Sequence, residues 1–112
     1  MAKVKITNSL FNEIEKKFKG EAQRIIDLME SLGDNPKKGK PLGQVEGIVI
    51  KELKYGKFRF YFITDGYILK FGTESELATL LIKFIRMSDK KSQQKTINEI
   101  KNILKSLGFE GF

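Results

Sequence analysis

The stretch Ile48–Ile63, IVIKELKYGKFRFYFI, predicts the centre of the fold. Two runs of strand-forming residues flank a short polar connection, which is the pattern of a β-hairpin with its tightest turn at Tyr55-Gly56. In the second run three phenylalanines alternate with Arg59, Tyr61 and Ile63, so the two sets point to opposite faces. We expect helices before and after the hairpin to cover the phenylalanines. The opposite face, with Arg59 and Tyr61, is then the predicted working surface.

Length and composition limit the possible classes of protein. The 112 residues predict a single domain, 1–112, with room for one hydrophobic core. With 40% hydrophobic and 31% charged residues, the chain is globular rather than disordered. It has no cysteine, which excludes disulfides and thiolate metal sites, and no histidine, the commonest general base and zinc ligand. We therefore expect no metal site and no cofactor.

The charge of the chain suggests the chemistry of its partner. Lysine and arginine number 21 against 14 acidic residues, a formal net charge of +7. On a small domain this charge favours a protein with a polyanionic partner, either nucleic acid or an acidic protein. The alternative is a protein that is merely rich in lysine and has no such partner. Met1–Ile6 is too short and too charged for a signal peptide, and no apolar run approaches the roughly 18 residues of a membrane span. We expect a cytoplasmic protein without membrane contact.

The residues before the hairpin predict a short strand followed by two amphipathic helices. The strand covers Lys3–Thr7, and Asn8-Ser9 offers N-cap side chains for a first helix that ends at Gly20. The second helix runs over Glu21–Gly33 with a continuous apolar stripe that we interpret as core. A basic loop, Lys37–Gly47, follows; it is either simply solvated or a flap over a groove.

The residues after the hairpin predict two more strands and a last helix. Asp65-Gly66 is a turn signal, Tyr67–Gly72 reads as a strand, and Leu77–Met87 as a last strand that could begin as a helical turn. A final helix over Ser92–Gly108 ends the chain, with phenylalanines in the tail that should dock on the body. Alternation in the last strand places Leu81, Lys83, Ile85 and Met87 on one face, and Leu80, Ile82, Phe84 and Arg86 on the other.

This order of elements predicts an α+β fold. We expect two N-terminal helices and a C-terminal helix packed on a mainly antiparallel, four- or five-stranded twisted sheet.

Several local phrases, taken in order, resemble the RelE/ParE/HigB toxin superfamily. They are Asn35-Pro36, Gly39–Leu42, Lys51–Lys54, Gly56–Phe62, Leu80–Arg86 and Lys90-Lys91. The resemblance covers nearly the whole chain and implies a RelE-like fold. It also implies the toxin of a type II toxin–antitoxin system, which is a metal-independent, ribosome-dependent mRNA endonuclease that inhibits translation or, in the ParE branch, a gyrase poison. An acidic antitoxin would neutralise it.

The same resemblance assigns candidate site residues. It places Arg59, Lys54 and Arg86 on basic positions of the family's motifs, while Tyr61 lies on the face of Arg59, one position short of the family's tyrosine. The predicted catalytic set is Arg59, Arg86, Lys54 and Tyr61. The predicted RNA-binding set is Lys57, Lys83, Lys90, Lys91 and Lys95. Cations of this kind would stabilise the charge that develops when a 2′-hydroxyl attacks the phosphate.

Each assignment has a structural alternative. Arg59 could be a structural cation paired with Glu52 across the hairpin, and Tyr61 could simply pack. Lys54 and Lys57 could be merely solvated. The chain also lacks the histidine or late tyrosine that family nucleases use for proton transfer. The second hypothesis is therefore a non-catalytic protein of the same fold, which is directed at gyrase or binds nucleic acid or an antitoxin.

Overall fold

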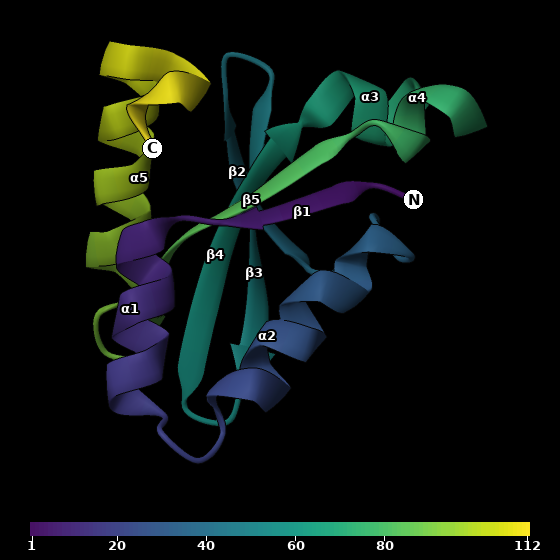
Figure 1. Cartoon of the computed structure of the whole chain (residues 1–112). Coiled ribbons are helices and arrows are strands. Elements are labelled where there is room, and N and C mark those ends of the chain that lie inside the picture. Colours follow the sequence, from purple (N-terminus) through teal and green to yellow (C-terminus); the bar gives the residue numbers. More distant parts are fainter.

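The computed structural model describes the whole chain, Met1–Phe112, and its centre is a five-stranded sheet (Figure 1). The strands are β1 (Lys3–Ile6), β2 (Lys40–Val45), β3 (Ile48–Tyr55), β4 (Phe58–Asp65) and β5 (Leu81–Asp89). Their order across the sheet is β1-β5-β4-β3-β2, and only the β1–β5 pair is parallel. The helices are α1 (Asn8–Lys17), α2 (Ala22–Glu30), α3 (Gly66–Phe71), α4 (Glu74–Ala78) and α5 (Gln93–Leu107), with 3-10 turns at Ser31–Gly33 and Gly108–Gly111. The predicted α+β class is confirmed.

The central hairpin forms as predicted, but its turn lies one residue later. Tyr55 pairs with Phe58, so the two turn residues are Gly56 and Lys57 rather than Tyr55 and Gly56. Gly56 has a φ of 58°, and Lys57 is not among the residues with positive φ. A positive φ at the first turn position alone is the pattern of a type II′ turn, whose twist suits a hairpin and which favours glycine there.

The predicted loop Lys37–Gly47 is wrong over most of its length, because β2 occupies Lys40–Val45. The strand joins β3 through a two-residue turn at Glu46 and Gly47, whose φ angles are 48° and 86°. Two positive φ angles define a type I′ hairpin turn, and Glu-Gly is a weaker signal for it than Asn-Gly. Pro41 and Gly43 flank an irregularity in the pairing, which a sheet tolerates at its edge.

The predicted strand Tyr67–Gly72 is also wrong, because this segment is the helix α3. The carboxylate of Asp65 accepts a hydrogen bond from the backbone N–H of Ile68 at 3.0 Å. Asp65 therefore acts as an N-cap, and Asp65-Gly66 begins a helix instead of turning a hairpin. Helix α4 follows with a full capping box between Thr73 and Glu76, where we expected a polar connection or the start of a strand.

A β-bulge in β5 changes which side chains share a face. Tyr61 pairs with Arg86 and Phe62 with Phe84, which leaves Ile85 as the extra residue. Alternation is interrupted there, so Arg86 lies on the same side of the sheet as Ile85, and Met87 returns to the side of Phe84. The predicted faces of Arg86 and Met87 were wrong for this reason.

Two hydrophobic clusters show that the sheet is covered on both faces. The first cluster joins the predicted phenylalanine face to α1 and α2, and its buried members include Phe60, Phe62, Ile14 and Ile25. The second cluster joins the other face to α5 and consists of Val45, Ile50, Tyr61, Ile63, Ile85, Ile97, Ile100 and Leu104. The expectation that this second face is an open working surface was wrong, because the apolar stripe of α5 covers it.

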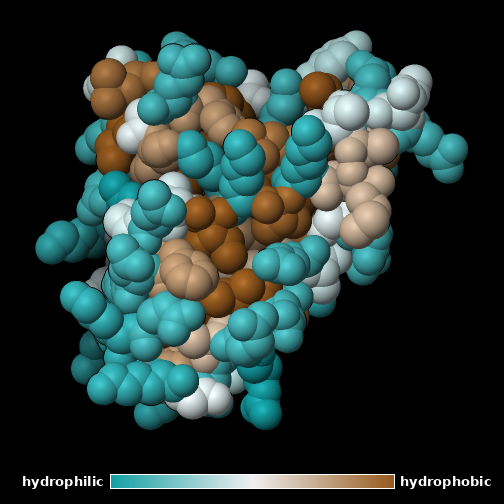
Figure 2. Space-filling view, in the orientation of Figure 1, coloured by the Kyte–Doolittle hydropathy of each residue, from teal (hydrophilic) through white to brown (hydrophobic).

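The surface on the side of α1 and α2 is mostly hydrophilic, with apolar atoms visible in its middle (Figure 2). None of the helices combines the length and the apolar character that a membrane crossing requires.

Candidate functional site

Basic side chains gather where the tip of the β3–β4 hairpin meets the end of β5. The pairing of Phe58 with Asp89 and of Arg59 with Ser88 brings these two segments together. They enclose a depression of about 660 Å³, which we call the basic depression. Its lining residues are Gly56, Lys57, Arg59, Asp89, Lys90 and Lys91. Four cations against one carboxylate leave a local charge of +3, from 4 − 1, so the depression favours an anionic ligand.

Arg59 is the only cation of the basic depression that the fold holds rigidly. Its side chain is 11% exposed, and its Nη1 donates to the backbone carbonyls of Gly56 at 3.3 Å and Phe58 at 3.1 Å. Its Nε lies 3.5 Å from a carboxylate oxygen of Glu52 but makes no hydrogen bond in that direction. The pair is thus a charge contact, and it leaves Nη2 available to a ligand.

Glu52 links Arg59 to the start of α5. The carboxylate is 1% exposed and accepts hydrogen bonds from Nε2 of Gln93 at 3.3 and 3.2 Å. Glu52 and Arg59 lie on the same face of the hairpin, as the structural alternative for Arg59 required. That alternative does not exclude function, because the paired guanidinium still lines the basic depression.

Tyr61 lies on the face of Arg59, as predicted, but it is fully buried under α5. Its hydroxyl is 2.7 Å from Oγ of Ser88, and that Oγ donates to the carbonyl of Asp89 at 2.9 Å. Tyr61 is therefore the donor to Ser88. Burial raises the pKa of the Tyr61 phenol above its usual value of 10.0. The residue packs in the core and has no access to a ligand in the basic depression.

Asp89 provides the single negative charge in the basic depression. Its Oδ1 accepts a hydrogen bond from the backbone N–H of Ser92 at 2.8 Å, and this bond is the main cause of the lowered pKa of Asp89. The carboxylate thus stays ionised and shapes the chain between β5 and α5. Lys90 and Lys91, which follow it, are exposed and extend from this connection.

Lys83 and Arg86 are engaged elsewhere and do not line the basic depression. Arg86 pairs with Glu99 of α5 at 2.8 Å, donates to the carbonyl of Ile85, and lies 5.1 Å from the ring centre of Phe112. Lys83 donates to the carbonyl of Phe112. The predicted docking of the tail phenylalanines is confirmed, and it accounts for both cations in the middle of an apolar strand. The expectation that Arg86 joins Arg59 in one catalytic set is therefore wrong, because Arg86 does not line the basic depression.

Two further predicted cations lie near the basic depression without lining it. Lys54 is exposed, opposite Arg59 on the same face of the hairpin. Lys95 is exposed in the first turn of α5. Of the nine predicted site residues, the structure therefore brings four together, Lys57, Arg59, Lys90 and Lys91.

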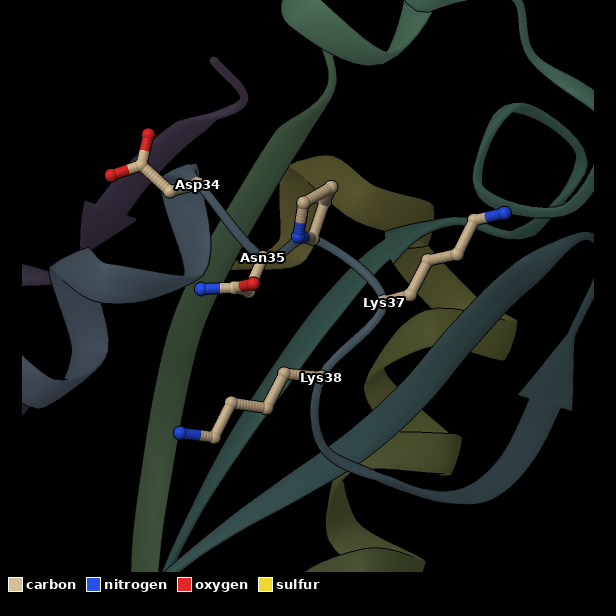
Figure 3. Close-up of a pocket in the computed structure, with 5 residues that line it drawn as sticks. Asp34, Asn35, Lys37 and Lys38 are labelled. Carbon is tan, nitrogen blue, oxygen red and sulfur yellow. The ribbon is translucent and has the colours of Figure 1, made fainter.

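A second depression of about 610 Å³ lies in the chain before β2 and is lined by Asp34, Asn35, Pro36, Lys37 and Lys38. Figure 3 shows the amino groups of Lys37 and Lys38 pointing away from one another. These two ammonium groups therefore do not converge on a shared ligand position. In the whole chain no group of three or more acidic side chains is placed to hold a metal ion.

Sequence reasoning missed one buried cation, Lys51. The residue is 4% exposed, its Nζ donates to the carbonyl of Lys37 at 2.9 Å, and burial lowers its pKa. Lys51 lies opposite Phe62, so alternation alone could have placed it on the phenylalanine face. Its carbonyl partner belongs to a loop, which no local pattern predicts.

Fold and site together define an α+β protein with a five-stranded mixed sheet and a basic depression suited to an anion. Comparison of the chain with protein-family models, with curated proteins and with solved structures finds no match.

Proposed function

We propose that the chain is a RelE-like toxin of a type II toxin–antitoxin system that binds the phosphate backbone of translated mRNA in the basic depression and cleaves it without a metal. The observation that carries this proposal is the convergence of Lys57, Arg59, Lys90 and Lys91 at one end of the sheet. Phosphate contacts from such cations supply most of the affinity of proteins for nucleic acid. The resemblance of the sequence motifs supplies the reaction and the ribosome as its setting.

The proposed chemistry is attack of a 2′-hydroxyl on the adjacent phosphate through a pentavalent phosphorane, which collapses to a 2′,3′-cyclic phosphate as the P–O5′ bond breaks. Solvent water would take the hydroxyl proton and supply a proton to the leaving 5′-oxygen. Nη2 of Arg59 would donate to one phosphate oxygen, since Nη1 is bound to two backbone carbonyls and Nε is buried against Glu52. The ammonium groups of Lys57, Lys90 and Lys91 would neutralise the remaining charge. Buried Tyr61 takes no part in this scheme.

A second candidate function is favoured by the burial of Tyr61. The phenol is inaccessible and the chain has no histidine, so neither usual group for proton transfer reaches the basic depression. A non-catalytic protein of the same fold would bind nucleic acid, an antitoxin or gyrase through the same cations. Such a protein would not cut RNA, whether or not its expression arrests growth.

Induced expression with mapping of mRNA 5′ ends separates these functions. We expect wild-type chain to arrest growth and to create new ends within translated regions. The variant Lys90→Ala/Lys91→Ala should lose both effects while keeping its fold, because both side chains are exposed. Lys105→Ala, an exposed lysine at the other end of α5, is the matched control and should behave as wild type. Growth arrest without new RNA ends but with DNA breaks would replace the nuclease by the gyrase-directed alternative.

We also propose that an acidic antitoxin is the protein partner, because the chain carries a net charge of +7. Titration with the product of a neighbouring gene for a small acidic protein, at low salt, tests this. Absence of a complex would remove the main support for the toxin–antitoxin assignment.

A further inference from the structure

The corner formed by α3 and α4 exposes two adjacent aromatic side chains. Tyr67 is 70% and Phe71 is 63% exposed, and their ring centres lie 5.3 Å apart. No residue of α3 is buried. Figure 1 shows the two helices together at one end of the sheet, away from α1 and α2. A contiguous exposed aromatic surface of this kind is typical of a contact surface rather than of a solvated helix.

A groove of about 550 Å³ lies directly beside this aromatic pair. Its apolar lining comes from β3, α3, the start of β5 and the tail, through Ile48, Tyr67, Ile68, Leu80, Leu81 and Phe109. Glu46, Gly47, Asp65 and Thr79 complete its lining. Tyr67 contacts Phe71 and also lines the groove. The exposed Phe71 ring and an apolar groove that could receive such a ring therefore lie next to each other. Interfaces obtain most of their affinity when an aromatic anchor fills such a pocket.

The charges around the aromatic pair have both signs. Lys70 lies 5.3 Å from the ring centre of Phe71, and Glu74 follows four residues later on α4. Neither forms a salt bridge within the chain. Over residues 65–78 one lysine stands against three acidic residues, a local charge of −2 on a chain of +7, so this corner repels a polyanion such as RNA. Lys70 and Glu74, which have opposite charges and no partner within the chain, remain available to pair with a second copy.

We propose that this corner is the interface of a homodimer. Helix α3 of one copy packs against α3 of the other about a two-fold axis, and Phe71 of each copy enters the groove beside Tyr67 of the other. Lys70 of each copy then faces Glu74 of the other. A two-fold interface needs a patch that is complementary to itself. This corner meets that requirement because Phe71 lies beside the groove and the unpaired Lys70 and Glu74 have opposite charges.

The size of the patch sets the expected strength of the dimer. Residues 65–78 and the seven further residues that line the groove make 21, at the lower limit of the 20–30 residues a side of a stable interface. We therefore expect a reversible dimer with a Kd between about 1 µM and 1 mM. The basic depression and α3 lie at opposite ends of β4, so the dimer would carry its two depressions at its outer ends. The dimer itself does not depend on the proposed function.

Sedimentation equilibrium of the full chain, from about 10 µM to 1 mM and at about 0.15 M salt, tests the proposal. The apparent mass should rise toward twice the monomer mass, and Phe71→Ser should raise the Kd at least tenfold. Leu107→Ser, a 66% exposed leucine on α5, is the matched control and should leave the Kd unchanged. A chain that stays monomeric at the highest concentration would overturn the proposal, as would a dimer that Phe71→Ser does not weaken.

A charge exchange tests the two-fold geometry independently of the aromatic anchor. Lys70→Glu and Glu74→Lys should each weaken self-association, because each places like charges opposite one another twice in the homodimer. Mixing the two variants should restore a dimer of the wild-type Kd, since both contacts are then attractive. Failure of the mixture to associate more tightly than either variant alone would contradict the proposed pairing.

Discussion

The guanidinium of Arg59 has structural contacts through Nε and Nη1, and in the proposed function it has a binding role through Nη2. Nε faces the buried carboxylate of Glu52, Nη1 is held by two backbone carbonyls, and the residue lines the basic depression. Glu52 is 1% exposed and depends on Arg59 for a countercharge, with Gln93 as its hydrogen-bond donor. Removing the arginine therefore affects the fold as well as any ligand.

Arg59→Ala should lower the free energy of unfolding by about 3 kcal/mol, because it leaves the buried Glu52 charge without its cation. Denaturation of Arg59→Ala, Glu52→Gln and the double variant measures the coupling. The double variant should lose less than the sum of the two single losses. Strict additivity would show that the 3.5 Å contact contributes nothing.

Arg59→Lys separates binding from stability, since it keeps the charge near Glu52 but loses the planar fork. We expect most of the stability to remain and RNA affinity to fall, as measured by fluorescence anisotropy with a single-stranded RNA. Unchanged affinity would remove Arg59 from the binding site.

Tyr61→Phe should cost about 1 kcal/mol, because it removes one hydrogen bond to Ser88 and leaves the Ser88 bond to the Asp89 carbonyl intact. Growth arrest and RNA binding should be unchanged. Loss of toxicity in a variant that melts within a few degrees of wild type would return Tyr61 to the catalytic set.

The raised pKa of Tyr61 also predicts a specific loss of stability in alkali. Above pH 10.0 the unfolded chain loses the phenol proton while the folded chain keeps it, so the folded state binds more protons and stability falls as pH rises. Below pH 10.0 both states keep the proton and no dependence arises from this group. The wild type should therefore lose its stability advantage over Tyr61→Phe above pH 10, measured by urea denaturation. Lys51 contributes equally to both proteins and cancels in this difference. If the free energies of unfolding of the two proteins changed in parallel with pH across this range, burial of Tyr61 would not be raising its pKa.

The helices differ in what they contribute to the fold. Helices α1 and α2 cover one face of the sheet and α5 covers the other, so both faces depend on an apolar stripe. Helices α3 and α4 bury no residue fully: Ile68, Leu69 and Leu77 are only partly buried against the first cluster, and Asp65 and Thr73 cap the two helices. They are therefore available for contact with a partner.

Because helices cover both faces, truncating either core should be costly. Ile25→Ala in α2 and Ile100→Ala in α5 should each lower the free energy of unfolding by roughly 2–5 kcal/mol, because both side chains are fully buried. Leu107→Ala, at an exposed position of α5, should change it by less than about 0.5 kcal/mol. A small effect of Ile100→Ala beside a large effect of Ile25→Ala would show that α5 packs loosely.

Charge is distributed unevenly over the molecule. The end that holds the hairpin tip carries the basic depression, whereas the corner of α3 and α4 is locally acidic. The net charge of +7 speeds the approach of an anionic polymer, and the uneven distribution decides which end it meets.

This distribution predicts the salt dependence of RNA binding. Lys57→Ala and Lys90→Ala should each reduce the slope of log K against log salt by roughly 0.7, the value for one contact with a single strand. Lys105→Ala should leave the slope unchanged. Equal slopes for all three variants would mean that RNA is attracted by the net charge without using the basic depression.

The sequence alone predicted the α+β class, the central hairpin, α1, α2 and α5, because each has an uninterrupted local period. The convergence of Lys57 and Arg59 at the hairpin tip also follows from local spacing. The same kind of reasoning failed at Asp65-Gly66, since an aspartate before glycine can turn a hairpin or cap a helix. The hydrogen bond from the backbone N–H of Ile68 to the carboxylate of Asp65 shows that the aspartate caps a helix here.

The place of Arg86 and the burial of Tyr61 were set by contacts between distant parts of the chain. A single extra residue at Ile85 rotates Arg86 toward α5, and no local pattern in β5 marks that bulge. Alternation correctly put Tyr61 opposite the phenylalanines, but it cannot tell a solvent-facing side from a covered one. The apolar stripe of α5 lies more than thirty residues after Tyr61 in the sequence. Because α5 packs on this face of the sheet, the expected working surface is a second core.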